Sequence, residues 1–144
     1  MVNVKQISVF LENKSGRLVD VCQALAEENI NIRALSIADT TDFGILRLIV
    51  DKPVEAFKRL KREGFAASET EVIAVAMPDN PGGLANVLEC LATGGVNLEY
   101  LYAFGGKREG CALVVFRVDD IPSALSILSA AKITVLPSEL VYSL

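Results

Sequence analysis

The sequence predicts an α+β protein of two ferredoxin-like βαββαβ modules, each an antiparallel sheet with helices on one face. Two observations support this prediction. The chain repeats itself at a spacing of sixty-six residues, and apolar residues change between strand and helix periodicity in the same order within each copy. We therefore expect residues 1–70 to form the first module and residues 71–144 the second.

The repeat includes residues that random apolar sequence would not reproduce in register. Gly16, in a loop, and Asn31, at the start of a strand, return as Gly82 and Asn97. Four apolar residues return at the same spacing: Leu18, Val21, Leu25 and Ile32 match Leu84, Val87, Leu91 and Leu98. The function of the chain should therefore be a property of this module.

In the first module, residues 4–11 alternate in polarity and predict a strand, and apolar residues at helical spacing follow from Leu18 to Leu25. Asn29 should end this helix because Asn tolerates the left-handed conformation, and Gly95 has the same place in the second copy. The remaining predicted elements are strands at 31–38, 43–50 and 65–70, a helix from Pro53 to Gly64, and a turn at Asp39, Thr40, Thr41 and Asp42.

The second module repeats this order. It is predicted to contain strands at 71–77, 96–104, 110–118 and 133–141, and helices at 81–93 and 121–131. Asn80 is predicted to cap the first helix, with Pro81 in its first turn, and Asp120 to cap the second. The join near Thr70 contains no low-complexity linker.

The charge of the chain argues against a nucleic-acid partner, because the net charge is −4 and nucleic acid requires clustered Lys and Arg. Basic residues cluster only at 58–62, on a predicted helix, where we expect a solvated face. Glu27 and Glu28 should diverge into solvent at the end of another helix. No apolar stretch reaches the roughly 18 residues of a membrane span, so we expect no membrane partner.

The cysteine and histidine content points to a non-catalytic protein of a reducing compartment. Cys22, Cys90 and Cys111 are odd in number and unclustered, and they are expected to be small buried hydrophobes. The N-terminus does not resemble a signal peptide, so we expect a cytoplasmic protein. Histidine is missing, which removes most catalytic dyads and the commonest metal ligand. We expect no enzyme activity, catalytic residue, cofactor or metal site.

Self-association is expected from the small size of the modules. About 70 residues lie near the lower limit for a stable core, and 51% of the chain is apolar. Residues 112–116 are apolar at both strand parities, which indicates a strand covered on both faces by the other module or by a partner chain. We expect a homodimer.

Each copy has one polar, glycine-bearing turn between its first strand and first helix. A glycine lets another group approach the backbone, and the free N–H groups of a helix N-terminus favour a carboxylate or phosphate. Asn13 and Asp79 lie at the mouth of this turn, and Asn31 and Asn97 begin the next strand. A carboxylate at the helix end and an ammonium held by Asn or Asp oxygens would suit a free amino acid. The same spacing is also compatible with simple caps and turns.

These motifs resemble those of ACT domains, which are regulatory modules that bind amino acids. Both copies follow the pattern Asn/Asp-x-Ser/Pro-Gly-x-Leu and then Val/Ile-Asn-Ile/Leu. The second copy is close to the family pattern, whereas the first has Asn13 for the usual Asp and Ser15 for the usual Pro. In that respect the first copy resembles the serine-sensing regulatory domain of a biosynthetic dehydrogenase.

The resemblance covers nearly the whole chain and implies a free-standing tandem ACT pair whose ligand lies at an interface between paired domains. The implied ligand-binding residues are Asn13, Lys14, Ser15, Gly16, Arg17, Leu18, Asn31, Ile32, Asp79, Asn80, Pro81, Gly82, Gly83, Leu84, Asn97 and Leu98.

Three functions remain open at this point. The leading one is a non-enzymatic sensor that binds a free amino acid, forms a homodimer and regulates an enzyme of amino-acid metabolism. The second is a ligand-free structural or protein-interaction module of the same fold. The third is an enzyme similar to acylphosphatases, which use an arginine in the first loop and an asparagine on a later strand. Arg17 and Asn31 resemble that pair only weakly, and Gly83 replaces the arginine in the second copy.

Overall fold

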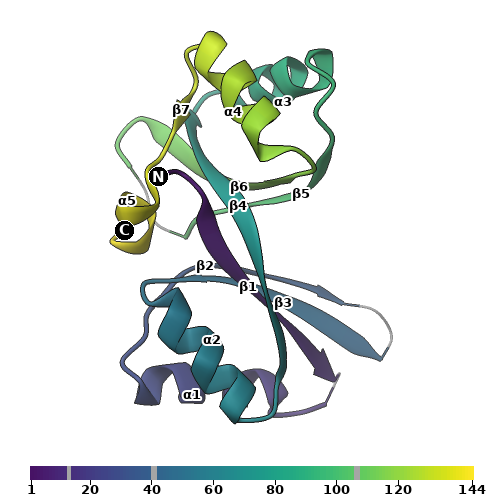
Figure 1. The fold of residues 1–144 in the computed structure, drawn as a ribbon, viewed down its shortest axis with the longest axis vertical. Coiled ribbons are helices and arrows are strands. Elements are labelled where there is room, and N and C mark those ends of the chain that lie inside the picture. Colours follow the sequence, from purple (N-terminus) through teal and green to yellow (C-terminus); the bar gives the residue numbers. More distant parts are fainter. Residues whose placement is uncertain (13, 40–41, 106–107) are drawn as a thin grey trace. The chain divides into compact units, whose positions relative to one another are not determined.

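The computed structural model describes residues 1–12, 14–39, 42–105 and 108–144 (Figure 1). The chain divides between Thr70 and Glu71 into two compact units. The N-terminal unit begins at Lys5, and the C-terminal unit, which begins at Glu71, also includes Met1–Val4. In each unit two helices cover one face of an antiparallel sheet (Figure 1), which confirms the predicted fold class.

The N-terminal unit contains one βαββαβ module. Its elements are β1 (Val4–Glu12), α1 (Arg17–Glu27), β2 (Ile32–Asp39), β3 (Phe43–Val50), α2 (Pro53–Arg62) and the first part of β4 (Ala66–Pro78). The strand order is β2-β3-β1-β4, and β3 runs antiparallel to both of its neighbours. In this register Ile7 lies opposite Leu48 and Val9 opposite Leu46. Thr40 and Thr41 of the predicted turn lie outside the described residues.

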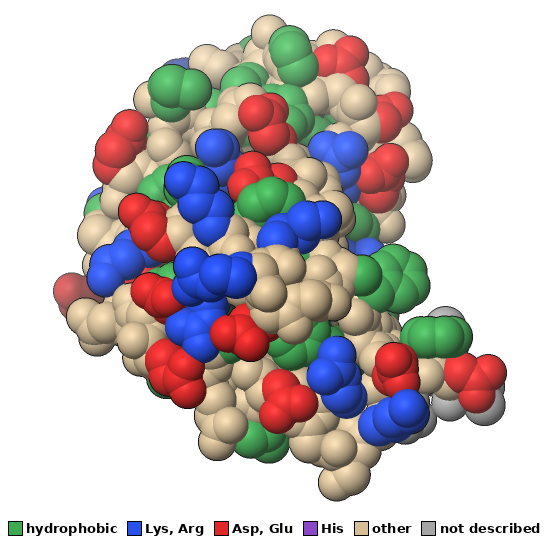
Figure 2. Space-filling view, turned by 60° about the horizontal axis from the view of Figure 1, so that its bottom comes forward, with side chains coloured by type: hydrophobic (Ala, Val, Ile, Leu, Met, Phe, Trp, Pro, Cys, Tyr) green, Lys and Arg blue, Asp and Glu red, His purple; other side chains and the backbone are tan. Residues whose placement is uncertain are grey.

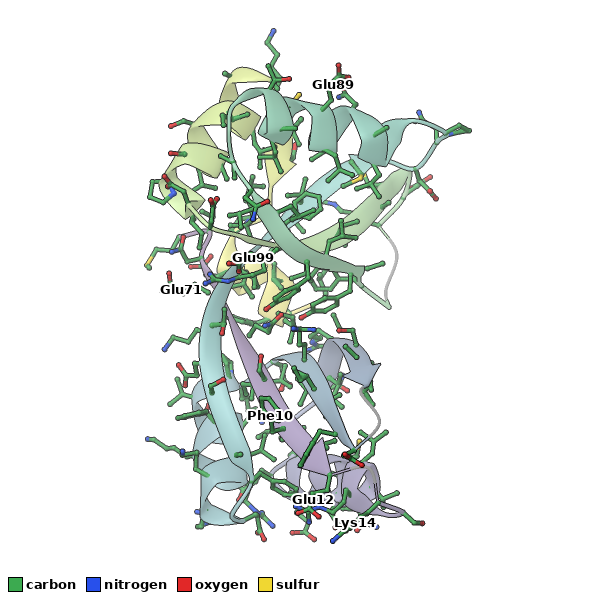
Figure 3. The ribbon with its side chains drawn as sticks, turned by 90° about the vertical axis from the view of Figure 1, so that its right-hand side faces the viewer. Phe10, Glu12, Lys14, Glu71, Glu89 and Glu99 are labelled. Atoms are coloured by element: carbon green, nitrogen blue, oxygen red, sulfur yellow. The ribbon has the colours of Figure 1, made fainter. Side chains whose placement is uncertain are left out.

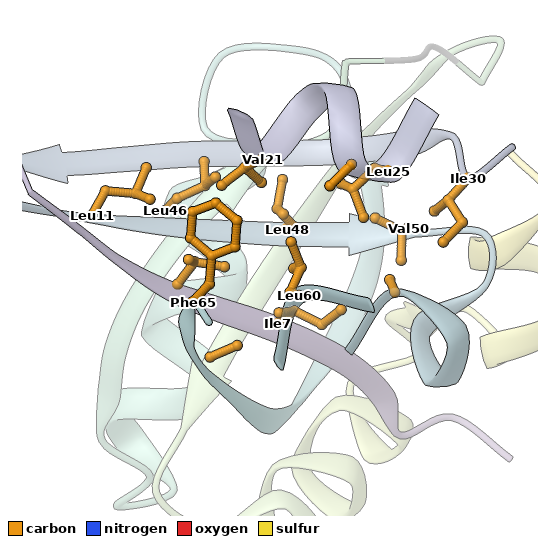
Figure 4. Packing of buried hydrophobic residues seen from close by; sticks show 14 residues of the cluster. Ile7, Leu11, Val21, Leu25, Ile30, Leu46, Leu48, Val50, Leu60 and Phe65 are labelled. Carbon is orange, nitrogen blue, oxygen red and sulfur yellow. The ribbon is translucent and has the colours of Figure 1, made fainter. Parts of the chain in front are cut away.

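The core of this unit lies between the sheet and the two helices (Figure 4). Alternate residues of β1 and β3 point toward the helices, because successive side chains of a strand face opposite sides. Val21 and Leu25 of α1 and Leu60 of α2 complete the layer and are buried. This layer fixes the position of α1, and therefore of the loop that precedes it.

The C-terminal unit repeats the arrangement. It contains the remainder of β4, α3 (Gly83–Thr93), β5 (Leu98–Ala103), β6 (Cys111–Val118), α4 (Ile121–Ala130), β7 (Thr134–Val135) and a short helix, α5 (Ser138–Tyr142). Strand β4 pairs with both β6 and β7, and β6 pairs with β5, all antiparallel. The order β5-β6-β4-β7 is therefore the order of the N-terminal unit, with β4 in the place of β1.

Several elements differ from the sequence prediction. Strand β4 is one continuous strand of 13 residues where two strands were predicted. The predicted closing strand is only two residues long and is followed by α5, because Pro137 interrupts the run. Helix α3 begins at Gly83 and its N-cap is Gly82, so the prediction that Asn80 is the cap was wrong.

Two predictions about helix ends are confirmed. The side chain of Asp120 caps α4 by accepting a hydrogen bond from the Ser123 N–H at 3.0 Å. The residues that follow α1 and α3 also adopt the left-handed conformation, with φ of 55° at Asn29 and 78° at Gly95. Asn and Gly thus serve the same backbone turn in the two modules.

The basic run on α2 is not simply a solvated face. Only 14% of the Arg59 side chain is exposed, and its guanidinium pairs with Glu27, Glu28 and Glu63. The prediction that Glu27 and Glu28 diverge was wrong, because one arginine from the adjacent helix reaches both. Lys and Arg are interspersed with Asp and Glu on the face that Figure 2 views, without a broad basic patch.

The burial of other residues was predicted only in part. Cys22 is exposed, contrary to prediction, while Cys90 and Cys111 are half-buried, and all three are free thiols. Residues Leu113, Val114, Val115 and Phe116 of β6 are buried within the single chain, so they do not by themselves require a partner chain. Of the helices described, none has the length and apolarity needed to span a bilayer.

The Arg59 cluster predicts a pH-dependent contribution to stability. The pKa of Glu28 lies below its ordinary value because its carboxylate accepts hydrogen bonds from Arg59. A carboxyl whose pKa is lower in the folded state stabilises the fold above its unfolded pKa, and this contribution is lost as pH falls through the folded pKa. Arg59→Met should therefore destabilise the protein near neutral pH, and the difference from wild type should close below pH 4.5. Urea unfolding at a series of pH values measures it.

Lys58→Met is the matched control, since it removes an exposed positive charge one residue away. It should show no pH-dependent difference from wild type. If the loss in Arg59→Met persists fully at low pH, Arg59 acts through packing of its stem rather than through its carboxylate partners.

Candidate functional site

The two glycine-bearing loops have the same backbone geometry. Gly16 and Gly82 are the N-cap residues of α1 and α3, and both have φ of 88°. In both loops the N–H of the next residue donates to the carbonyl three residues earlier, at 3.4 Å in the first loop and 3.1 Å in the second. The repeated glycine therefore reflects one repeated turn.

Both helices begin without a side-chain cap. As a result the N–H groups of Leu18 and Val19 in α1, and of Leu84 and Ala85 in α3, have no acceptor among the described residues. Such groups at a helix N-terminus carry partial positive charge and can bind a carboxylate. Asn13, predicted to lie beside the first of these positions, is outside the described residues.

The predicted asparagines lie at the other end of these helices. The N–H of Asn31 donates to Asp51 at 2.9 Å and that of Asn97 to Asp119 at 3.0 Å, where each asparagine leads into the next strand. Helix α1 has 11 residues and therefore spans about 16 Å at 1.5 Å per residue. A single amino acid cannot contact the loop and the asparagine of the same module.

This separation also counts against the acylphosphatase alternative. Arg17 begins α1 and Asn31 follows its far end, so the two residues do not converge on one substrate. No group of three or more Cys, Asp or Glu with the spacing of a metal site occurs in the part of the chain that the structure describes.

A cavity of about 550 Å³ adjoins the loop of the C-terminal unit. It lies between the end of β4, the loop and first turn of α3, the start of β6 and the connection from α4 to β7. The residues that line it are Ala76, Met77, Pro78, Asn80, Pro81, Gly82, Gly83, Asn86, Val87, Gly110, Cys111, Ala131, Lys132, Ile133 and Thr134. Four predicted residues, Asn80 to Gly83, therefore line a real cavity, whereas Asp79 and Leu84 are exposed beside it.

Sequence reasoning missed Lys132, which is the charged residue of this lining. It belongs to the helix–strand connection at the end of the module, 50 residues after the loop. A signal was present in the sequence. When the second helices of the two copies are aligned, Lys132 falls opposite Gly64.

The charged side chains of the N-terminal loop have partners within the chain, although Arg17 Nε is buried without an acceptor among the described residues. Lys14 pairs with Glu12 at 2.8 Å, and both lie at the end of β1 (Figure 3). This hydrogen bond holds the pKa of Glu12 below its ordinary value. The Arg17 guanidinium lies 3.5 Å from Asp20 and 4.8 Å from the centre of the Phe65 ring. The exposed Ser15, Gly16 and Leu18 complete the predicted set in this loop.

The glycines of the second loop have different roles. A Cβ at Gly82 would meet no atom within 4 Å, so a substitution there is opposed only by the positive φ. A Cβ at the buried Gly83 would overlap the carbonyl oxygen of Pro78. Gly83 is therefore the position at which the helix touches the strand and at which a side chain cannot be accommodated.

We expect Gly83→Ala to destabilise the protein more than Gly82→Ala. The first substitution forces the loop away from Pro78, at a cost of about 2–3 kcal/mol. The second places alanine in the left-handed region, at a cost of about 1–2 kcal/mol. Urea unfolding at neutral pH measures both, and an equal or reversed effect would contradict the packing assigned to Gly83.

Comparison with known proteins agrees with this geometry. Residues 2–141 match the family model of the ACT domain pair. No protein of curated function matches the chain in sequence. The chain is similar to a protein of Bacteroides thetaiotaomicron known from a crystal structure, with 43% identity over 99% of this chain and 98% of that one and a TM-score of 0.94.

Two further structures are similar in fold. The ligand-free regulatory subunit of aspartate kinase from Thermus thermophilus has 19% identity, coverage of 91% of this chain and 93% of that one, and a TM-score of 0.65. The corresponding subunit from Thermus flavus has 19% identity, coverage of 92% and 94%, and a TM-score of 0.64. The repeated module, the paired glycine turns and the match over residues 2–141 lead to one conclusion: this chain belongs to the family of ACT domain pairs, which are regulatory modules.

Proposed function

We propose that the protein is a non-enzymatic regulator that binds a free amino acid at the loop before α3. The observation that carries this proposal is the cavity of about 550 Å³ beside that loop. The uncapped first turn of α3 supplies N–H donors at the same place. The lining combines apolar residues such as Met77 and Val87 with polar ones such as Asn80, and small-molecule sites commonly combine the two.

The charges of an amino acid suit this loop. Its carboxylate would accept hydrogen bonds from the N–H groups at the start of α3, and its ammonium would face the carboxylate of Asp79. The loop before α1 offers the same backbone with Asn13 in place of Asp79. Because a helix separates each loop from the asparagine of its own module, Asn31 or Asn97 can join a site only from another module, and we propose that pairing of domains supplies it.

We further propose that the protein acts in the cytoplasm on an enzyme of amino-acid metabolism. The support is the likeness in fold to the regulatory subunits of aspartate kinase. Those proteins are regulatory subunits, and the same role fits a chain whose residues 2–141 match the ACT domain pair.

A protein-interaction role is favoured by one specific feature. Leu35 and Ile37 of the edge strand β2 and Phe43 of β3 are 50%, 48% and 47% exposed. An edge strand has unpaired backbone groups, and exposed apolar side chains beside it are typical of a surface that a partner covers. We propose that this edge pairs with a second copy of the chain.

Amino-acid binding is tested by thermal unfolding in the presence of each of the twenty L-amino acids, followed by calorimetry. A ligand at 100 times its Kd should stabilise the native state by about 2.7 kcal/mol and raise the melting temperature. Asp79→Ala should weaken binding by about 1–3 kcal/mol, because the ammonium loses its charged partner. Glu89→Ala, an exposed carboxylate on the same helix, is the control and should bind normally. If no amino acid binds, the interaction module becomes the preferred function.

Self-association is tested by sedimentation at micromolar concentrations. The wild-type protein should be a dimer, and Ile37→Lys should shift it to monomer by placing a charge in the covered surface. Val54→Lys changes a similarly exposed apolar residue on α2 and should leave the dimer intact. A wild-type monomer, with and without amino acids, would contradict the proposed pairing.

A further inference from the structure

The turn from α1 into β2 carries Asn31, and the residues just before α2 hold its backbone. The Asn31 N–H donates to Asp51 at 2.9 Å, and the Asp51 N–H donates back to the Asn31 carbonyl at 3.1 Å. The Lys52 ammonium donates to the carbonyl of Asn29 at 3.0 Å. The turn is therefore bonded on both sides of its left-handed residue.

The Arg59 cluster fixes the start of the same turn. It consists of Arg59, Glu27, Glu28, Arg62 and Glu63. The central guanidinium pairs with Glu28 at 2.9 Å and with Glu63 at 2.7 Å, and it also reaches Glu27. Arg62 adds a second bond to Glu28 at 3.0 Å. Since Glu27 is the last residue of α1 and Glu28 its C-cap, these pairs hold α1 against α2 immediately before the turn.

Burial distinguishes this cluster from an ordinary surface ion pair. Only 14% of the Arg59 side chain is exposed, and each of its guanidinium nitrogens donates to a different carboxylate. Exposed ion pairs contribute little because salt screens them, whereas partly buried pairs are screened only in part. Removal of the arginine would also leave three neighbouring carboxylates to repel one another. The position of the end of α1 should therefore depend on this one positive charge.

The C-terminal unit holds its asparagine beside an uncharged helix contact. The Asn97 N–H donates to Asp119 at 3.0 Å and the Asp119 N–H donates back at 3.1 Å, so the inner bonds of the turn repeat. Beside this turn Ile127 of α4 lies against Gly94, where a Cβ would overlap the isoleucine side chain. Helices α3 and α4 are therefore in direct apolar contact at the place where α1 and α2 are joined by ion pairs.

The two contacts occupy the same positions of the module. The first helices align by Asn31 with Asn97, and the second helices by the left-handed Gly64 with Lys132. On this alignment the charged set Glu27, Glu28, Arg59 and Glu63 corresponds to Thr93, Gly94, Ile127 and Ala131. The charged set and the uncharged set are thus two solutions for one helix contact.

We infer that Arg59 is a positioning residue that holds the turn of Asn31 through charge, whereas apolar packing holds the turn of Asn97. Ionic strength should then act on the asparagine of the N-terminal unit alone. What Asn31 contacts in a ligand or partner rests on the proposed function, whereas its positioning by Arg59 does not. A site that Asn31 joins would depend on salt in a way that a site with Asn97 would not.

Amide hydrogen exchange on the full chain, followed by NMR without any ligand, tests this inference. It measures the opening of single hydrogen bonds, here those of the Asn31 and Asn97 N–H groups. Both groups donate to an aspartate, so Asn97 is an internal control for the effect of salt on such a bond. Between 0.1 M and 1 M NaCl the Debye length falls from about 10 Å to about 3 Å. Protection of Asn31 should fall by about threefold, and that of Asn97 should stay constant.

Single variants isolate the charge of Arg59. Arg59→Met keeps an apolar stem and should lower the protection of Asn31 by about tenfold in 0.1 M NaCl, with little salt dependence left. Arg59→Lys keeps the charge and should restore part of this protection. Lys58→Met removes an exposed charge from the same helix and should change neither quantity. A loss of equal size at Asn31 and throughout β1 would show global destabilisation only and would overturn the inference.

A combined variant transfers the uncharged contact to the N-terminal unit. Its substitutions are Glu27→Thr, Glu28→Gly, Arg59→Ile and Glu63→Ala. The protection of Asn31 should then no longer respond to salt, as that of Asn97 does not. A salt response that persists would place its source outside the Arg59 cluster, at Lys52 or Asp51, and the inference would be wrong.

The outcomes separate this inference from the proposed function. If exchange at Asn31 is indifferent to salt and to Arg59→Met while an amino acid binds, the inference is wrong and the proposed function stands. If the exchange results hold but Asn31→Ala changes neither amino-acid binding nor sedimentation, the positioning stands and the proposed role of Asn31 is wrong.

Discussion

The chemistry of each module depends on a left-handed residue immediately before its first helix. Gly16 and Gly82 take a φ of 88° that other residues rarely adopt, and this conformation starts α1 and α3 without a capping side chain. The contrast is α4, where Asp120 caps the helix and satisfies the Ser123 N–H. A side-chain cap contributes about 1 kcal/mol to helix stability. The first helices forgo this contribution, and their free N–H donors stay available to a ligand.

The same backbone carries different side chains beside its first helix in the two units. In the N-terminal unit Arg17, Asp20 and Phe65 line a smaller cavity of about 330 Å³ beside the helix, and Lys14 is paired with Glu12. In the C-terminal unit Gly83 allows the helix to touch the Pro78 carbonyl. A cavity of about 550 Å³ remains there, and the exposed Lys132 is among the residues that line it. Duplication of one module thus permits the two copies to carry different chemistry beside the same backbone turn.

Much of the fold could be predicted from the sequence because it depends on local patterns. Alternation placed β1 and β3 to within a residue, and Pro53 marked the start of α2. The errors occurred where local patterns compete. Residues 133–141 were predicted to form a closing strand, but Pro137 ends it and Ser138–Tyr142 form a helix. Asn80 is a good capping residue, yet the left-handed Gly82 takes that place.

The candidate site was predictable only in its loop. Asn80 to Gly83 were identified because the glycine turn repeats at a fixed spacing. The glycine repeat does not reach Lys132, because the first copy has Gly64 at that position. Antiparallel pairing of β7 with β4 brings Lys132 close to the loop. The pairing of Arg59 with Glu27 and Glu28 was missed for the same reason, because it joins two helices whose contact depends on the packed core.

The small size of the C-terminal unit gives ligand binding a large effect on its stability. A unit of about 70 residues buries a smaller share of its surface than a larger domain and has a correspondingly modest free energy of unfolding. A ligand at 100 times its Kd would add about 2.7 kcal/mol, which is a considerable fraction of that value. The N-terminal unit has Arg17 where the C-terminal unit has Gly83, so a ligand that binds only beside Gly83 would stabilise the C-terminal unit directly. Binding would thus stabilise the C-terminal unit more than the N-terminal unit. A protein that contacts the C-terminal unit would then respond to the concentration of the ligand.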